Sequence, residues 1–234
     1  MRCCKSLVCV CLFLLAVVPA YCQRGTFGID IGQTSDTFAG LPTQSTAVFL
    51  VDGEFAVIKS NLKTERPAVV AGGEARFPED ALNHAKEFAL YGGVHFKFMN
   101  NNLTIGVDGQ VRKIYMPTAF VNNQFFDRDN MGLFELPILV RYKFGSARRA
   151  FIEAKGAPEF TPHFRASGAE LQLPHPNFDH GYFIQGSAGY VFGRWYVKGT
   201  YENRYFKFED NQNNPSNLYN WRTNRFSAGI GVSF

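Results

Sequence analysis

Apolar and polar residues alternate with a period of two along most of the chain. The final stretch, Arg225 to Phe234, shows this most clearly, because large apolar side chains fill every second position and small or polar ones lie between them. Side chains alternate across a β-strand, so this stretch predicts a strand with one apolar face and one small, polar face. The aromatic ring at its end suits a strand that is anchored at a membrane interface.

Alternating runs follow one another from residue 68 onwards. They cover 68–77, 88–98, 103–115, 133–144, 150–164, 182–192, 195–208 and 225–234. A strand needs roughly 9–11 residues to cross a bilayer at a tilt, so these runs are long enough. The segment 25–58 adds either no strand or two, and Asp52-Gly53 is a candidate hairpin turn within it. We therefore favour eight strands and keep ten as the alternative.

The connections between these runs alternate in length. Tight turns at 99–102, 145–148 and 193–194 alternate with long polar connections at 78–86, 116–132, 165–181 and 209–224. Transmembrane barrels have short periplasmic turns and long outer loops, whereas a soluble sandwich has no reason to sort its connections in this way. The sequence predicts an all-β, closed, antiparallel, up-and-down transmembrane barrel over residues 67–234, which follows an N-terminal segment, 23–66, that is a loop or an extra hairpin.

The start of the chain has the order of a secretory signal peptide. Arg2 and Lys5 precede an apolar stretch, 7–18, that is too short for a membrane-spanning helix. A proline and small residues follow, which predicts a cleaved signal peptide over residues 1–22. Cleavage after Ala20 or after Cys22 fits this pattern.

Cysteine content and charge exclude several classes of protein. All five cysteines lie in the predicted signal peptide, so the exported chain would have neither a disulfide nor a cysteine metal site. Removal of Arg2 and Lys5 lowers the formal charge from +4 to +2. This balanced charge, together with the absence of a basic run or an RNA-binding motif, argues against a nucleic-acid partner.

Charged residues fall on the small, polar face of the runs, which a closed barrel directs into its lumen. The predicted interior network comprises Glu74, Arg76, His95, Lys97, Asp108, Arg112, Glu135, Arg141, Lys143, Glu153, Lys155, Lys198, Glu202 and Arg204. Opposite charges on neighbouring strands can pair there, and an unpaired buried charge would be costly. We expect a plugged lumen at eight strands and a narrow water path at ten.

Aromatic residues make up 15% of the chain and gather near the predicted strand ends. A girdle at the periplasmic interface is predicted from Phe96, Phe98, Tyr142, Phe144, Phe192, Trp195 and Phe234. The outer connections carry Phe125, Phe126, Tyr219 and Trp221, which either contact a partner or lie at the outer lipid interface.

The signal peptide, the alternating runs, the uneven connections and the closing R-F-S-A-G-I-G-V-S-F resemble the small outer-membrane β-barrel proteins of double-membraned bacteria, of the OmpA-like or porin type. The resemblance implies a place in the bacterial outer membrane and assembly by the β-barrel insertion machinery. The recognition signal that it implies for that machinery is Phe226, Ile230, Val232 and Phe234. We further expect a monomer that is surrounded by outer-membrane lipid and has no cofactor.

Three functional classes fit this pattern. We favour a non-enzymatic barrel of structural, adhesive or small-porin type, in which the outer loops hold any surface ligand. The alternative is a lipid or peptide hydrolase that uses His163, His175 and His180, which cluster around one outer loop. Glu170 and Asp179 lie near them, but neither G-x-S-x-G nor H-E-x-x-H occurs. A soluble lipocalin-like barrel with an apolar interior comes last, because the charges fall on the predicted inner face.

Overall fold

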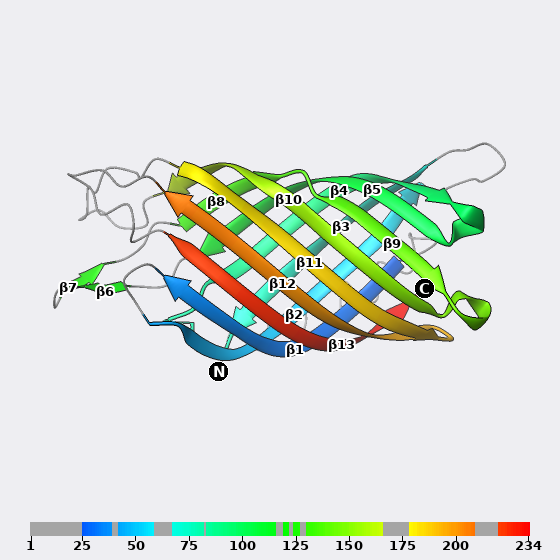
Figure 1. The fold of residues 1–234 in the computed structure, drawn as a ribbon, viewed down its shortest axis with the longest axis horizontal. Helices are drawn as coiled ribbons and strands as arrows, with labels where there is room; N and C mark the ends of the chain where they lie inside the picture. The colour runs from blue at the N-terminus through cyan, green and yellow to red at the C-terminus, as the bar shows by residue number, and fades with distance from the viewer. Residues whose placement is uncertain are drawn as a thin grey trace.

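The alternating sequence forms ten long antiparallel strands that close into a barrel (Figure 1). The computed structural model describes residues 25–38, 42–58, 67–81, 83–115, 119–121, 124–126, 130–165, 178–208 and 220–234. The predicted signal peptide, residues 1–22, lies outside the described residues. Within the described part of the chain, no helix has the length and hydropathy needed to cross a membrane.

The barrel wall consists of β1 (Gly25–Phe38), β2 (Gln44–Ile58), β3 (Ala68–Pro78), β4 (Lys86–Phe98), β5 (Leu103–Tyr115), β8 (Asn130–Glu135), β9 (Ile138–Phe144), β10 (Ala150–Arg165), β11 (Phe178–Phe192), β12 (Trp195–Phe208) and β13 (Trp221–Ser233). The short strands β6 (Ala119–Val121) and β7 (Gln124–Phe126) pair only with each other. Two 3-10 segments, η1 (Met99–Asn101) and η2 (Ser146–Arg148), complete tight turns.

β8 and β9 are two parts of one barrel strand. Both pair with β5 on one side and with β10 on the other. Pro137 lies between them and has no N–H to donate, which explains the interruption. The Pro137 carbonyl still accepts a hydrogen bond from the Asp108 N–H at 3.0 Å. The side-chain alternation continues across this point, so the wall stays closed.

The barrel closes between its first and last strands. β1 pairs with β13 from Thr26 opposite Ser233 to Phe38 opposite Trp221. Gly25 and Phe234 exchange two backbone hydrogen bonds, of 2.8 and 3.0 Å, at the end of this seam. Closure pairs backbone groups that lipid could not satisfy.

The segment 25–58 supplies β1 and β2, so the preferred count of eight strands is corrected to the alternative of ten. The proposed turn at Asp52-Gly53 is also wrong. Asp52 lies opposite both Gly28 and Glu74 inside an uninterrupted β2. Its carboxylate faces the lumen, where Lys198 binds it at 3.0 Å, so the strand continues through a pair of residues that would otherwise favour a turn.

The two ends of the barrel differ. Tight turns at 99–102, 145–149 and 193–194 gather at the end drawn on the right of Figure 1, which we name the turn end. β5, β10 and β12 end, and β8, β11 and β13 begin, at the opposite end, which we name the loop end. The alternation of short and long connections holds from β3 onwards. It fails before β3, because 39–43 is short at the loop end and 59–67 is longer at the turn end.

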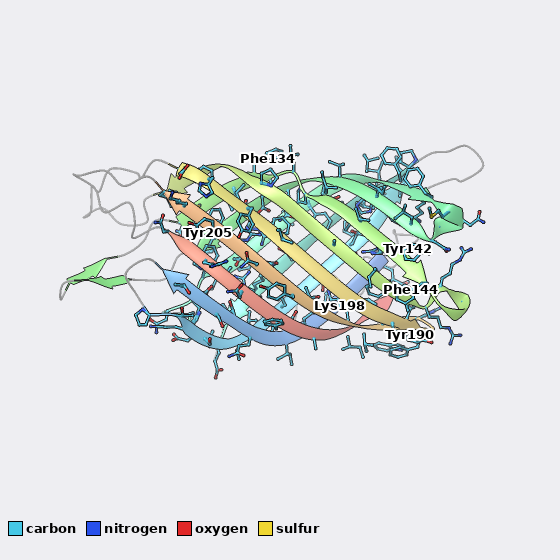
Figure 2. The ribbon with its side chains drawn as sticks, viewed as in Figure 1. Phe134, Tyr142, Phe144, Tyr190, Lys198 and Tyr205 are labelled. Carbon is cyan, nitrogen blue, oxygen red and sulfur yellow. The ribbon has the colours of Figure 1, made fainter. Side chains whose placement is uncertain are left out.

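The outer wall is apolar. Ile31, Leu90 and Phe226 have 67%, 69% and 64% of their surface exposed, as expected of side chains that face lipid. The predicted girdle residues Phe96, Phe98, Tyr142, Phe144, Phe192 and Trp195 are likewise exposed. Figure 2 shows Tyr142, Phe144 and Tyr190 close to the turn end.

A second aromatic belt, which the sequence analysis missed, lies toward the loop end. It includes Phe88, Tyr115, Phe134 and Tyr205, and Figure 2 shows Phe134 and Tyr205 there. Phe88 makes edge contacts with Phe77 and Tyr115, at ring separations of 5.4 and 5.8 Å. An apolar band between two aromatic belts is the exterior that a bilayer requires.

The lumen as the candidate functional site

The lumen contains three layers of side chains. Beginning at the loop end, we name them the apolar cap, the arginine–glutamate network and the vestibule. The apolar cap consists of Ala85, Ile114, Met131, Leu133, Phe206, Phe208 and Trp221, all at most 5% exposed. These residues come from β5, β8, β12, β13 and the β3–β4 connection, so side chains from opposite walls meet across the lumen.

A buried polar contact fixes the cap. The Trp221 indole stacks on Phe206 at a ring separation of 5.6 Å and donates from Nε1 to Asp36 Oδ1 at 3.1 Å. His84 Nδ1 lies 2.6 Å from the other Asp36 oxygen. Both His84 and Asp36 are buried. The connection after β3 is held to the wall as well, since Glu79 N–H donates to the Ala47 carbonyl at 2.9 Å.

The sequence analysis placed Trp221 at a partner contact or at the outer lipid interface, but the structure places it inside the lumen. It is 1% exposed and belongs to the cap. β13 begins at Trp221, four residues before the predicted run, and Trp221 has the same strand parity as the inward-facing Thr223 and Arg225. Phe125, Phe126 and Tyr219 have no described side chains.

The arginine–glutamate network lies beneath the cap and consists of Arg76, Arg112, Arg204, Arg225, Glu74, Glu87, Glu135, Glu159 and Glu202. Arg76 lies 2.5 Å from Glu202 and 3.2 Å from Glu87. Arg225 binds the same two carboxylates and lies 2.9 Å from Glu202. β3, β4, β12 and β13 are thereby cross-linked through the lumen.

The network continues to the opposite wall. Arg112 lies 2.9 Å from Glu87 and 3.2 Å from Glu135, and it also binds Glu74. Arg204 lies 2.7 Å from Glu135 and 3.0 Å from Glu159. Apart from Glu74, these side chains are at most 4% exposed. Most of these deeply buried charges have two or more partners, which offsets the cost of burying them, whereas Glu159 pairs with Arg204 alone among the described residues.

The vestibule, between the network and the turn end, holds smaller charge clusters. Lys198 lies 3.0 Å from Asp52 and 3.4 Å from Asp30. Asp108 contacts His95 at 3.0 Å and Lys155 at 3.6 Å. A third cluster pairs Arg141 with Glu153 at 2.5 Å. A cavity of about 50 Å³ lies between Lys198 and the network. Several of these side chains are 12–30% exposed, so this layer is more open than the network.

The structure places the predicted interior residues on the inward faces of their strands. Those that are buried are Arg76, His95, Asp108, Arg112, Glu135, Glu202 and Arg204. Those that are half-buried are Glu74, Lys97, Arg141, Lys143, Glu153, Lys155 and Lys198. All of them lie in one lumen, divided between the network and the vestibule.

The sequence analysis missed Asp30, Asp52, Glu87, Glu159 and Arg225. Glu87 directly precedes the predicted run 88–98, so extending the alternation by one residue would have included it. Arg225 has the same parity as the small residues of the last strand, which is a usable signal. The two aspartates lie in the segment that was not assigned as strands.

The histidines of the outer loops form no described site. His163 and His175 have no described side chains, and neither has Glu170. His180 is exposed and lies 3.2 Å from Asp179, which also contacts Lys207 at 3.1 Å. Among the described residues, no group of three or more His, Cys, Asp or Glu side chains is arranged to hold a metal ion.

Comparisons with known proteins find likeness in shape only. No protein-family model and no curated protein matches the chain. The outer membrane protease OmpT from Escherichia coli is 11% identical with a TM-score of 0.48, and the match covers 91% of this chain and 97% of that one. Neisserial surface protein A is 9% identical with a TM-score of 0.37, over 90% and 97%. Ail of Yersinia pestis is 10% identical with a TM-score of 0.31, over 90% and 98%.

At such identities and TM-scores, these likenesses transfer no activity to this chain. Its own geometry defines its class, because an apolar wall with two aromatic belts surrounds a charged lumen and the backbone closes on itself. The chain is a transmembrane β-barrel, as the sequence predicted. The lipocalin-like alternative is wrong, because the interior carries the charges and the exterior the apolar side chains.

Proposed function

We propose that this protein is a sealed, non-enzymatic barrel of a bacterial outer membrane, with a structural or adhesive role at its loop end. One observation carries the proposal: buried side chains of the arginine–glutamate network and the apolar cap join strands on different sides of the barrel across the lumen. This arrangement favours the structural or adhesive role over the small-porin role.

Barrel width alone would favour a water path, since interior space grows with the number of strands. Here, long arginine and glutamate side chains occupy that space. An ion moving through the network would have to break pairs such as Arg76–Glu202 and Arg204–Glu135, whose side chains are at most 3% exposed. Removing one partner of a buried pair costs about 3–5 kcal/mol, which opposes conduction.

A rigid scaffold supports a surface role. The network joins strands around the barrel, and the cap ties the β3–β4 connection to the wall through the contact between His84 and Asp36. Loops that are held by such a scaffold commonly carry recognition. The longest connections, 116–129, 166–177 and 209–220, all begin and end at the loop end.

Planar-bilayer recording of the purified barrel tests whether the lumen is sealed. We expect no large, stable conductance steps from the folded protein. A change of electrophoretic mobility on boiling, the usual sign of a closed barrel in detergent, shows that the sample is folded. The double variant Trp221→Ala/Arg204→Ala, which removes cap and network side chains together, should conduct if it still folds. Large, stable steps from the unaltered chain would overturn the proposal.

A hydrolase remains the second candidate, because His180 and Asp179 form an exposed contact at the loop end. Lipid and peptide cleavage should be assayed with the unaltered barrel and with the triple variant His163→Ala/His175→Ala/His180→Ala. Cleavage that the triple variant loses would favour this candidate over the non-enzymatic role. Equal activity in both, or none in either, would remove it.

A further inference from the structure

The turn end carries three exposed arginines. Arg148 and Arg149 lie in the turn between β9 and β10, and Arg194 lies in the turn between β11 and β12. Within the described part of the chain, none of them forms an ion pair with a carboxylate. We name these three residues the arginine band. Exposed, unpaired arginines at one edge of a barrel are available to an anionic partner.

Backbone contacts hold the two turns in fixed positions. β10 and β11 are neighbours, and the Val191 N–H donates to the Arg149 carbonyl at 2.8 Å. The Arg194 carbonyl accepts from the Ser233 N–H at 2.7 Å. The Arg148 guanidinium also donates to the Asn100 carbonyl in the adjoining turn. The arginine band therefore lies on a rigid edge.

The band lies directly beyond the aromatic girdle. Phe144 precedes the first turn, and Phe192 and Trp195 flank the second. All three rings are exposed on the outer wall, and Figure 2 shows Phe144 close to the turn end. Such rings lie at the level of lipid headgroups, so guanidinium groups one to five residues further along the chain are within reach of headgroup phosphates.

The loop end has a different charge pattern. Its described exposed charges have both signs, and one group of them pairs locally: Asp179 contacts Lys207 at 3.1 Å and His180 at 3.2 Å. Local pairing of this kind leaves less net charge for an external anion. What distinguishes the turn end is that its three described exposed positive charges are all arginines, held in two turns that backbone contacts fix.

We propose that the arginine band binds the phosphate groups of anionic glycerophospholipids in the leaflet at the turn end. A guanidinium presents a planar set of donors that matches two phosphate oxygens, and its charge is permanent. Each basic residue near an anionic lipid surface contributes roughly fivefold in affinity, so the loss of all three should weaken binding by about a hundredfold. This site is independent of the surface role proposed for the loop end.

Native mass spectrometry of the folded barrel with added cardiolipin, phosphatidylglycerol or phosphatidylcholine tests this proposal. We expect both anionic lipids to bind more tightly than phosphatidylcholine. The variant Arg148→Gln/Arg149→Gln/Arg194→Gln should lose that preference, and the corresponding Arg→Lys variant should keep part of it. Boiling-dependent gel mobility shows whether each variant is folded.

A matched variant separates the band from general electrostatics. Lys86→Gln/Lys113→Gln/Arg222→Gln removes the same charge from exposed positions toward the loop end and should bind anionic lipid as the unaltered chain does. Equal losses in both triple variants would overturn the proposal, as would an unchanged preference in the band variant. Arginine-dependent binding to peptidoglycan sacculi without any preference for anionic lipid would also overturn it, and would identify a cell-wall polymer as the partner instead.

Discussion

The arginine–glutamate network and the vestibule lie in the same lumen but differ in their chemistry. In the network every base is arginine, and side chains such as Arg204 and Glu135 are fully buried. In the vestibule Lys198 and Lys155 carry much of the positive charge, and their side chains are 15% and 12% exposed. Arginine is weakly hydrated and pairs with two carboxylates at once, whereas the ammonium of lysine keeps its water strongly. The lysines thus occur only in the layer that water reaches, whereas the fully buried layer contains arginine alone among its bases.

The difference in exposure between the network and the vestibule also means that their charges are stabilised in different ways. Beneath the apolar cap, most network charges have several partners, because desolvation is severe and screening is weak. Toward the turn end, solvent screens the pairs and each contributes less. The network should therefore stabilise the closed barrel far more strongly than the vestibule does, and substitutions can test this.

The largest expected effect comes from Arg204→Ala. It leaves Glu159 without the guanidinium that lies 3.0 Å away and removes one of the two arginines at Glu135. We expect the free energy of unfolding to fall by about 3–5 kcal/mol, the cost of breaking a buried pair. Reversible urea unfolding in lipid vesicles measures it.

The control for that prediction is Arg141→Ala in the vestibule. The Arg141 side chain is 30% exposed and pairs with Glu153 alone in the described structure, so its loss should cost less than about 1 kcal/mol. Equal costs for the two substitutions would show that the layers do not differ in stabilising power.

The second-largest expected loss of stability comes from a substitution on the outer wall of the barrel. Ile31→Arg puts a charge on a side chain that is 67% exposed and lies opposite Ala228 in the middle part of the β1–β13 seam. We expect it to lower the free energy of unfolding in vesicles by about 2–4 kcal/mol, whereas Ser45→Arg near the loop end should cost about 0–1 kcal/mol. If Ile31→Arg proves harmless, lipid does not surround this part of the wall.

Most of the fold could be read from the alternation. The face of each predicted strand follows from parity, and Phe134 and Glu135 show it, with one exposed side chain and one buried. The number of strands could not be read in the same way. The segment 25–58 contains Asp52-Gly53, which favours a turn locally, and only the long-range pairs to Gly28 and Glu74 overrule that preference.

The residues of the lumen were also predictable only in part, because their arrangement depends on long-range strand pairing. Parity identifies which charges point inward, but it does not show which of them share a depth in the barrel. Strand register decides that, and it places Glu87 opposite Arg76. Trp221 could not be assigned to the cap from the sequence, because it lies within a polar stretch where a single aromatic residue gives no period.

Trp221→Phe sharpens the comparison between the cap and the layers below it. The substitution keeps an aromatic ring beside Phe206 but removes the indole N–H that Asp36 accepts at 3.1 Å. A buried carboxylate that loses a donor costs about 1–3 kcal/mol, which should appear as a lower free energy of unfolding. No loss of stability would mean that His84 alone satisfies Asp36.

The smallest expected effect compares alanine substitution of a glycine on the inner face of the wall with that of a glycine on the outer face. A Cβ at Gly32, on the inner face of β1, would lie 2.7 Å from the backbone Cα of Ser227, whereas a Cβ at Gly186 on the outer face meets nothing within 4 Å. Backbone cannot rotate away as a side chain can, so Gly32→Ala should cost about 1–3 kcal/mol and Gly186→Ala almost nothing. Thermal unfolding of the two single variants in the same detergent measures the difference. Equal melting temperatures would show that β1 and β13 can shift at this pair to accommodate a methyl group.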